Sequence, residues 1–277
     1  MKNFKDSKWL LENIKAKDLI VLDARAALMD PLEGKRQYDL SHIRGARYVD
    51  LEEILTGEIE THGGRHPLPE LDEFIENMEY MGVGDSSKVL IYDDGSLAMA
   101  GRLWYLFKLI GKEDVYILEG GIEAFLENGG ELTEEVPVLE ERGNLSLNLK
   151  DDILVDMDYV KEKIDDETTA IVDVRAYERY IGEVEPLDKI AGHIKSAVNY
   201  PWMELVQKGE RIDLKKLEME FKNLKDYKEI IVHCGSGITG TVAMMLLDEI
   251  GKESKLYSGG YSDWVSYKDN RVVKGRE

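Results

Sequence analysis

The sequence predicts an α/β protein built as a tandem pair of similar domains, each a mostly parallel sheet with helices on both faces. Two observations support this prediction. Several segments of the first half recur in the second half, beginning with VLDAR at 21–25 and IVDVR at 171–175. Within each copy, short apolar runs alternate with longer helix-like stretches, a pattern typical of parallel sheets. With 277 residues, the chain is long enough for two domains of ordinary size.

The repeat extends along most of the chain. SHIRGA at 41–46 recurs as GHIKSA at 192–197, VLIYD at 89–93 as IIVHC at 230–234, and Gly120-Gly121 as Gly259-Gly260. Because chance similarity would not preserve the order of the segments, we interpret the pattern as duplication of one unit. The first domain is expected over 1–134, a linker over 135–150, where Pro137 and Gly143 interrupt any periodicity, and the second domain over 151–277.

Apolar runs rich in β-branched residues are predicted to be the buried strands, because strands of a parallel sheet are covered on both faces. In chain order they are LIVLDAR at 19–25, KVLIYDD at 88–94, DVYILEG at 114–120, AIVDVR at 170–175, EIIVHC at 229–234 and SKLYSGG at 254–260. The clearest helices are expected at 71–81, 98–110, 214–223 and 239–250. Gly111 and Gly251 follow the second and fourth of these, where a helix C-terminus favours glycine.

Charge and composition exclude several classes of function. Acidic residues outnumber basic ones by 56 to 36, which gives a formal net charge of -20. The electrostatic field of this negative charge repels phosphate backbones and anionic lipids, so we expect no nucleic-acid partner and no membrane partner. The N-terminal segment lacks the apolar core of a secretion signal, and no stretch is long enough to span a bilayer, so a cytoplasmic location is the default expectation.

Cys234 is the single cysteine, which excludes an internal disulfide and every multi-cysteine metal site. His62 and His66 are four residues apart, but Gly63-Gly64 between them makes a helical metal pair improbable. We therefore expect neither a metal nor another cofactor.

The segment from Ile230 to Gly240 is predicted to run from a strand through a tight turn into a helix. Glycines at 235, 237 and 240 let a short loop curl so that several N–H groups point inward, and the following helix directs its N-terminal dipole at the same point. Both effects favour the thiolate form of Cys234 and make it a nucleophile at the sheet edge where α/β proteins bind ligands. The alternative is that Cys234 is a small buried apolar residue.

Two other interpretations of this loop fit the sequence less well. Gly235, Gly237 and Gly240 match the G-x-G-x-x-G dinucleotide pattern, but the next strand ends in Ser258-Gly259-Gly260 and lacks the acid that holds a ribose. His233-Cys234 also begins like a cysteine phosphatase loop. The arginine expected six positions after the cysteine is replaced by Gly240, so the group that would grip a phosphoryl oxygen is missing.

With these features together, the chain resembles the two-domain rhodanese family, the thiosulfate and 3-mercaptopyruvate sulfurtransferases, over nearly its whole length. The shared motifs are the repeated D-x-R strands, the two His-Ile turns, His66-Pro67-Leu68-Pro69, Arg179-Tyr180-Ile181-Gly182 and the Cys234 loop. The resemblance implies two rhodanese-like domains, the first catalytically degenerate, with Asp93 at the position that matches Cys234.

The resemblance implies that Cys234 takes a sulfane sulfur from thiosulfate or 3-mercaptopyruvate as a persulfide and passes it to cyanide or a thiol, a thioredoxin-like protein being one candidate. Substrate contacts are expected from Arg179 and from the loop residues Gly235, Gly237, Ile238 and Thr239. The Cys-Gly-Ser-Gly-Ile-Thr sequence resembles the mercaptopyruvate type, in which Ser236 forms a proton relay with a histidine and an acid. His42 is the best match for that histidine, and Glu33 or Asp30 is a candidate acid.

Some positions depart from the family pattern or have a simpler explanation. A second substrate arginine is expected near Pro186, where this chain has Leu187, and Lys189 could replace it only as a point charge. Arg25 and Arg175 are better explained by ion pairs with Asp23 and Asp173. His193 is predicted to be structural, and a structural hydrogen bond remains the alternative for its counterpart His42. A sulfur-carrier or regulatory binding module without turnover is the alternative function.

Overall fold

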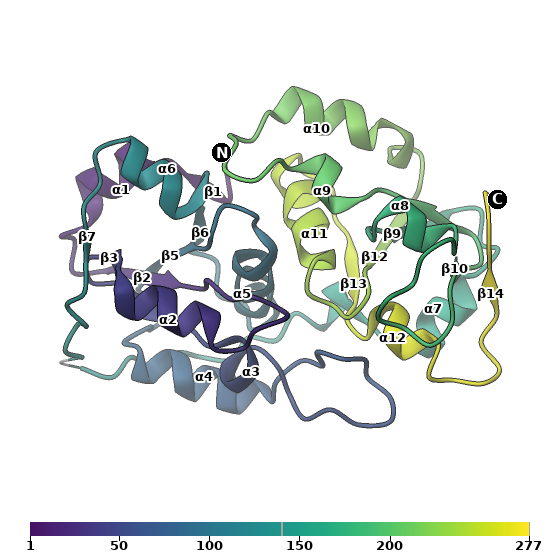
Figure 1. Cartoon of the computed structure of the whole chain (residues 1–277), viewed down its shortest axis with the longest axis horizontal. Coiled ribbons are helices and arrows are strands. Elements are labelled where there is room, and N and C mark those ends of the chain that lie inside the picture. The colour runs from purple at the N-terminus through teal and green to yellow at the C-terminus, as the bar shows by residue number, and fades with distance from the viewer. Residues whose placement is uncertain (140, 277) are drawn as a thin grey trace. The chain divides into compact units, whose positions relative to one another are not determined.

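The computed structural model describes residues 1–139 and 141–276. Glu140, within the expected linker, and Glu277, at the end of the expected second domain, lie outside the described residues. The chain forms two compact units (Figure 1). The first unit contains Met1–Gly57, Leu68–Lys150 and Lys208–Ile212, and the second unit contains Glu58–Pro67, Asp151–Gln207 and Asp213–Glu277.

The first unit is built on a five-stranded sheet in which every pair of neighbouring strands is parallel. Its order is β1 (Phe4–Lys5), β6 (Val115–Leu118), β5 (Lys88–Tyr92), β2 (Leu19–Asp23) and β4 (Arg47–Tyr48). A small antiparallel pair joins β3 (His42–Ile43) to β7 (Leu132–Thr133). The helices are α1 (Ser7–Asn13), α2 (Glu33–Leu40), α3 (Leu51–Ile54), α4 (Leu71–Tyr80), α5 (Ala98–Leu109) and α6 (Gly121–Glu127).

The second unit repeats this plan, which confirms the duplicated α/β fold. Its parallel sheet has the order β11 (Ala197–Asn199), β9 (Thr169–Asp173), β12 (Glu229–His233), β13 (Lys255–Tyr257) and β8 (Leu154–Val155). The antiparallel pair is β10 (His193–Ile194) with β14 (Val272–Val273). The helices are α7 (Met157–Lys163), α8 (Tyr177–Tyr180), α9 (Trp202–Leu205), α10 (Leu214–Glu220), α11 (Gly240–Glu249) and α12 (Gly260–Trp264), with 3-10 turns η1 (Asp151–Ile153) and η2 (Phe221–Leu224).

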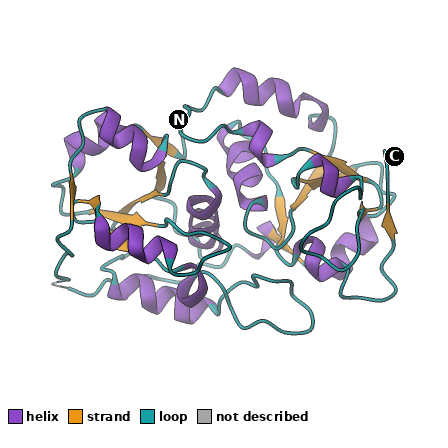
Figure 2. Cartoon of the chain, in the orientation of Figure 1, coloured by secondary structure: helices purple, strands orange, loops and turns teal. Residues whose placement is uncertain are grey.

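Burial explains why these sequences form these elements. All residues of β2 and β9 are buried, as expected for strands with helices on both sides (Figure 2). Helices α5 and α11 are buried over nearly their whole length, so they carry apolar residues all round rather than on one stripe. Each is followed by a glycine at positive φ, Gly111 at 81° and Gly251 at 74°, which ends the helix where the sequence predicted.

The compact units differ from the division expected from the sequence. Residues 58–67 lie in the first repeat but pack in the second unit, and residues 208–212 lie in the second repeat but pack in the first. The stretch expected as a linker, 135–150, packs on the first unit: Leu145 is buried and the Gly143 N–H donates to the Glu79 carbonyl. The exchange of short segments is the feature of the fold that matters most for the site.

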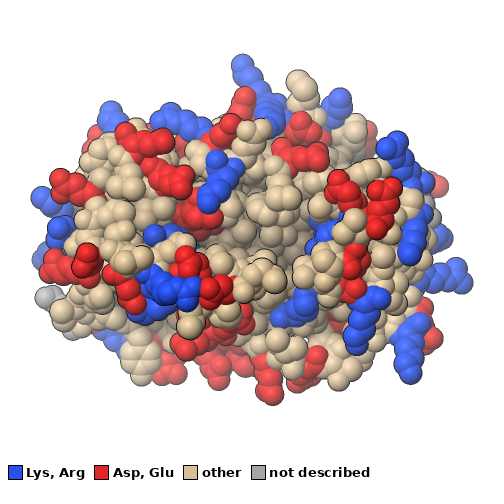
Figure 3. All heavy atoms as spheres, in the orientation of Figure 1, with Lys and Arg blue, Asp and Glu red and all other residues tan. Residues whose placement is uncertain are grey.

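Two surface properties complete the description. Acidic and basic side chains are intermixed over the face shown in Figure 3. Among the described residues, none of the helices has both the length and the apolar character needed to cross a bilayer.

Candidate active site

Cys234 immediately follows β12, at the carboxyl end of the second sheet, and begins the loop that leads into α11. The side chain is buried, with 2% of the residue exposed. The Gly237 N–H donates to the Cys234 Sγ over 3.1 Å, and Gly237 has a φ of 82° that aims this N–H back at the sulfur. The inward-facing amide predicted from the glycine pattern is therefore present. Ile238 and Thr239 complete the loop before α11 begins at Gly240.

The loop is held from behind by the start of α12. The Tyr261 and Ser262 N–H groups donate to the carbonyls of Cys234 and Gly235, each over 2.8 Å. The start of α12 and the cysteine loop lie so close together that there is no room for a side chain at Gly260, where a Cβ would lie 2.7 Å from the Cys234 carbonyl oxygen. The paired glycines that recur in the sequence thus let a helix N-terminus fix the backbone of the cysteine loop.

Ser236, two positions after the cysteine, contacts a histidine from residues 58–67, the segment of the first repeat that packs in the second unit. The Nδ1 atom of His66 lies 2.7 Å from the Ser236 Oγ, and both residues belong to the second unit. Ser236 is buried and His66 is half-buried, so the hydrogen bond is partly shielded from water. A histidine on a buried hydroxyl can remove or return a proton through that hydroxyl.

The exchanged segment, residues 58–67, is fixed to α12 and its neighbours by several contacts. The Gly63 N–H donates to the Asp263 carboxylate over 2.7 Å, and the Arg65 N–H donates to the Ser262 Oγ over 3.2 Å. Gly64 has a φ of 86°, and a Cβ there would lie 2.3 Å from the Gly259 carbonyl oxygen. These glycines bring His66 to Ser236 at a fixed position.

The structure places His42 in a different role from the relay predicted for it. His42 is completely buried in the first unit, and its two ring nitrogens lie 2.8 Å from the Tyr38 carbonyl and 3.1 Å from the Glu135 carbonyl. The ring also stacks on Tyr38 with centroids 3.9 Å apart. These contacts correspond to the structural alternative, and the histidine at Ser236 is His66. The candidate acids Asp30 and Glu33 instead bind Arg36.

His193 has the arrangement of His42, as expected for the structural residue of the second repeat. Its Nδ1 lies 2.8 Å from the Tyr180 carbonyl, and its ring stacks on Tyr180 at 3.8 Å. The expected strand-to-loop ion pairs are also present: Asp23 with Arg25 and Asp173 with Arg175, each at 2.6 Å. In both copies the arginine also donates to a carbonyl of the His-Ile turn, that of Ser41 or Gly192.

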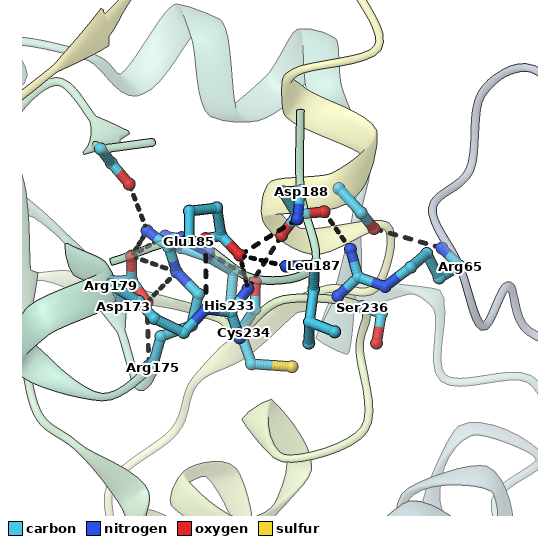
Figure 4. A network of polar contacts seen from close by, with 12 residues as sticks. Arg65, Asp173, Arg175, Arg179, Glu185, Leu187, Asp188, His233, Cys234 and Ser236 are labelled. Atoms are coloured by element: carbon cyan, nitrogen blue, oxygen red, sulfur yellow. Dashed lines mark hydrogen bonds and ion pairs between the residues drawn. The ribbon is translucent and has the colours of Figure 1, made fainter. Parts of the chain in front are cut away.

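Charged side chains form a network beside the cysteine loop (Figure 4). Arg179, at the end of α8, binds Glu185 at 2.8 Å and Asp188 at 2.9 Å. Asp188 also pairs with Arg65 of the exchanged segment. Arg179 lies close to the loop, because a Cβ at Gly235 would be 3.5 Å from its Nη1. Arg179, for which substrate binding was predicted, therefore lies beside the loop, and Leu187, where a second arginine was expected, is half exposed.

Burial raises the pKa values of the carboxyl groups in this network, and pairing with arginines lowers them. Burial by itself raises the pKa of Asp173, but Arg175 and His233 outweigh it and hold the pKa at about 2. Burial also opposes ionisation of Glu185, yet hydrogen bonds from Arg179 and two backbone amides keep its pKa below the usual value. Burial dominates at Asp188 and raises its pKa, against the attraction of Arg65 and Arg179. The network therefore holds both permanent carboxylates and one that takes up a proton more readily.

The first unit has a carboxylate where the second has its thiol. Asp93 follows β5 as Cys234 follows β12, and its carboxylate accepts N–H bonds from Gly95 at 2.8 Å and from Leu97 and Ala100 at 3.3 Å. Burial and the neighbouring Asp94 raise the pKa of Asp93 to about 6, against these N–H bonds. The side chain at this loop position thus accepts backbone N–H bonds in both repeats, three at the Asp93 carboxylate and one at the Cys234 sulfur.

Comparison with known proteins identifies the family. A family profile described as the rhodanese-like domain matches residues 6–128 and 156–267. The chain belongs to the rhodanese family. A probable 3-mercaptopyruvate sulfurtransferase of Pseudomonas aeruginosa is 35% identical over 265 residues, 93% of each chain. The thiosulfate sulfurtransferase of Rattus norvegicus is 28% identical over 285 residues, 98% of this chain and 95% of the relative.

A solved rhodanese structure agrees with the sequence comparison. The crystal structure of SseA from Escherichia coli, described in terms of 3-mercaptopyruvate sulfotransferases, matches with a TM-score of 0.81 at 32% identity, over 95% of this chain and 100% of that one. The predicted enzyme class, a sulfurtransferase with two rhodanese domains, is thereby confirmed. Such an enzyme takes sulfur from a small-molecule donor and passes it to a thiol or cyanide.

Sequence reasoning did not place two residues, His66 and Arg65, beside the Cys234 loop, where the structure has them. His66 begins the His66-Pro67-Leu68-Pro69 motif, which was recognised but not connected to the Cys234 loop, and Arg65 directly precedes that motif. The signal that could have found them is Gly63-Gly64, which marks a segment that must pass close to other backbone. Among the described residues, no cluster of three or more His, Cys, Asp or Glu side chains is arranged to hold a metal ion.

Proposed function

We propose that the enzyme transfers sulfur from 3-mercaptopyruvate through a persulfide on Cys234. The Cys234 thiolate attacks the donor sulfur, an S–S bond forms, and the C–S bond breaks with its electron pair remaining on carbon as the enolate of pyruvate. The proton of the donor S–H is then delivered to that carbon, which yields pyruvate and leaves the persulfide anion on the enzyme. An acceptor thiolate or cyanide takes the outer sulfur and restores the Cys234 thiolate.

The hydrogen bond between His66 and Ser236 is the observation that favours this donor over thiosulfate. Cleavage of 3-mercaptopyruvate needs a proton moved from sulfur to carbon, and a hydroxyl bonded to a histidine at 2.7 Å is suited to that transfer. Thiosulfate releases sulfite, a stable anion that needs no proton in order to leave. A buried relay two positions after Cys234 would therefore have little use in a thiosulfate enzyme.

The remaining contacts support a persulfide intermediate. The Gly237 N–H already donates to the Cys234 Sγ at 3.1 Å, and it stabilises negative charge on sulfur without a metal. The substrate-binding role of Gly235, Ile238 and Thr239 is part of the proposal, because these residues belong to the same loop between β12 and α11.

The acceptor and the compartment are also part of the proposal. A thioredoxin-like protein is a suitable acceptor because its reactive thiolate attacks a persulfide directly. A cytoplasmic location agrees with such chemistry, because thiol acceptors stay reduced there.

Mass spectrometry of the intact protein tests the proposal. After incubation with 3-mercaptopyruvate and no acceptor, the wild-type chain should gain the mass of one sulfur atom and release one equivalent of pyruvate. Cys234→Ser should gain none. The value of kcat/KM with 3-mercaptopyruvate should exceed that with thiosulfate. An unchanged mass with both donors contradicts sulfur transfer, and a higher value for thiosulfate contradicts the donor assignment.

A further inference from the structure

Two guanidinium groups converge on the residue that follows the catalytic cysteine. A Cβ built on Gly235 would lie 2.9 Å from the Nη2 of Arg65 and 3.5 Å from the Nη1 of Arg179. Arg179 comes from α8, whereas Arg65 comes from the exchanged segment. Both side chains are partly exposed, 32% for Arg65 and 17% for Arg179, so a small molecule can reach them.

Each guanidinium keeps at least one nitrogen near the loop that its partner carboxylates do not use. Arg65 binds Asp188 through Nη1, and Arg179 binds Asp188 and Glu185 through Nη2 and Nε. The nitrogens nearest to a Cβ at Gly235 are Nη2 of Arg65 at 2.9 Å and Nη1 of Arg179 at 3.5 Å, with the carboxylate-bound Nη2 of Arg179 at 3.6 Å. Within the described part of the chain, Nη2 of Arg65 and Nη1 of Arg179 donate to none of the carboxylates that hold these two arginines.

Asp188 explains how two like charges are kept together. Its carboxylate is 3% exposed and accepts a hydrogen bond from each arginine, one on each oxygen (Figure 4). The repulsion between the guanidinium groups is thereby offset, while their outer N–H groups remain directed at the loop. A second anion placed beside Gly235 would complete the coordination of both arginines.

We propose that Arg65 is a substrate-binding residue that, together with Arg179, holds the carboxylate of the sulfur donor beside Cys234. The proposal rests on the proposed function and names the residue that takes the place left by Leu187, whose side chain carries no charge. Arg65 also adjoins His66, so one short segment supplies an anion-binding group and a proton-transfer group to the loop. Docking of this segment thus assembles the donor site.

Two sulfur donors, one with and one without a carboxylate, distinguish a substrate-binding role of Arg65 from a structural role. One is 3-mercaptopyruvate, and the other is 1-mercaptopropan-2-one, in which a methyl group replaces the carboxylate. Arg65→Gln should raise KM for 3-mercaptopyruvate by about 10- to 100-fold, the loss expected for one charge-assisted interaction, with kcat little changed. KM for the neutral ketone should not change. Arg65→Lys keeps the charge but not the planar fork, so its KM should be intermediate.

The control is Arg142→Gln, which removes the same charge from a surface pair with Glu79 in the first unit and should leave both KM values unchanged. Equal loss of activity with both donors would show that Arg65 only holds the loop, and would overturn the inference. An unchanged KM for 3-mercaptopyruvate would also overturn it while leaving the proposed function intact. If the wild-type protein gains no sulfur from 3-mercaptopyruvate, the proposed function fails and the inference fails with it.

Discussion

The Nδ1 atom of His66 lies 2.7 Å from the Ser236 hydroxyl, although 170 positions separate the two residues in the chain. The contact exists because the segment 58–67 leaves the first repeat and packs in the second unit. The proposed relay joins one residue from each sequence repeat. On this proposal the first repeat contributes to the reaction even though it has Asp93 in place of a thiol.

Ser236→Ala should impair the two donors to different degrees. Loss of the relay hydroxyl should lower kcat for 3-mercaptopyruvate by about 100- to 10,000-fold, the range typical of positioned acid–base groups. Thiosulfate cleavage should change little, because sulfite leaves without a proton. Steady-state assays of pyruvate and of sulfite measure the two reactions.

The matching variant His66→Asn should reproduce this selectivity. The two substitutions should also be non-additive, since each removes the same relay, so the double variant should resemble either single one. A uniform loss with both donors would show that the pair shapes the loop and does not move a proton.

His42→Ala should act on stability and not on the reaction. The substitution removes the contacts of the ring nitrogens with the Tyr38 and Glu135 carbonyls, one of them a hydrogen bond from the ring N–H, and a stacked ring, and it should lower the free energy of unfolding by about 1–3 kcal/mol. Urea denaturation measures this loss, and kcat per folded molecule should stay at the wild-type value. A selective fall in kcat with 3-mercaptopyruvate, without loss of stability, would return His42 to the relay.

The fold could be predicted from the sequence because its signals are local and repeated. Apolar runs such as 229–234 became strands, and Gly111 and Gly251 ended the helices where expected. The boundaries of the units could not be predicted. Nothing in the composition of 58–67 or 208–212 shows on which sheet they pack, since that depends on contacts with residues far away in the chain.

The site was predicted in part for the same reason. Cys234, Gly237 and Ser236 lie in one short loop, so their spacing alone predicts an amide directed at the sulfur. His42 was named for the relay because the resemblance suggested it as the best match, and it occupies a turn that recurs in both halves. Recurrence, however, is typical of residues that stabilise the fold of each copy, and a group needed once for chemistry need not recur.

Asp93→Asn should change how stability depends on pH. The folded pKa of about 6 is above the ordinary value of 3.8, so the folded state binds the proton more tightly than the unfolded chain does. Stability from this group is fully present below about pH 4 and is lost as the pH rises through about 6. Asparagine cannot ionise, so the variant should gain about 2–3 kcal/mol relative to wild type between pH 4 and pH 7.

Urea midpoints of the two proteins at both pH values test this sign for Asp93. The comparison between variant and wild type cancels the other groups that titrate in the same range. A difference that stays constant with pH would mean that the Asp93 carboxylate is ionised throughout, with the three N–H bonds outweighing its burial.

Moderate salt should raise kcat/KM for anionic donors. The chain has a formal charge of -20, so a donor anion is repelled at long range until salt screens the field, over about 8 Å at physiological ionic strength. The network beside Cys234 does not reverse this repulsion, because the guanidinium groups of Arg65, Arg175 and Arg179 are matched by the carboxylates of Asp173, Glu185 and Asp188. Assays in increasing salt should show the rise with 3-mercaptopyruvate and thiosulfate and none with neutral 1-mercaptopropan-2-one. A steady fall with both anions would show that the arginines act at long range as well as in contact.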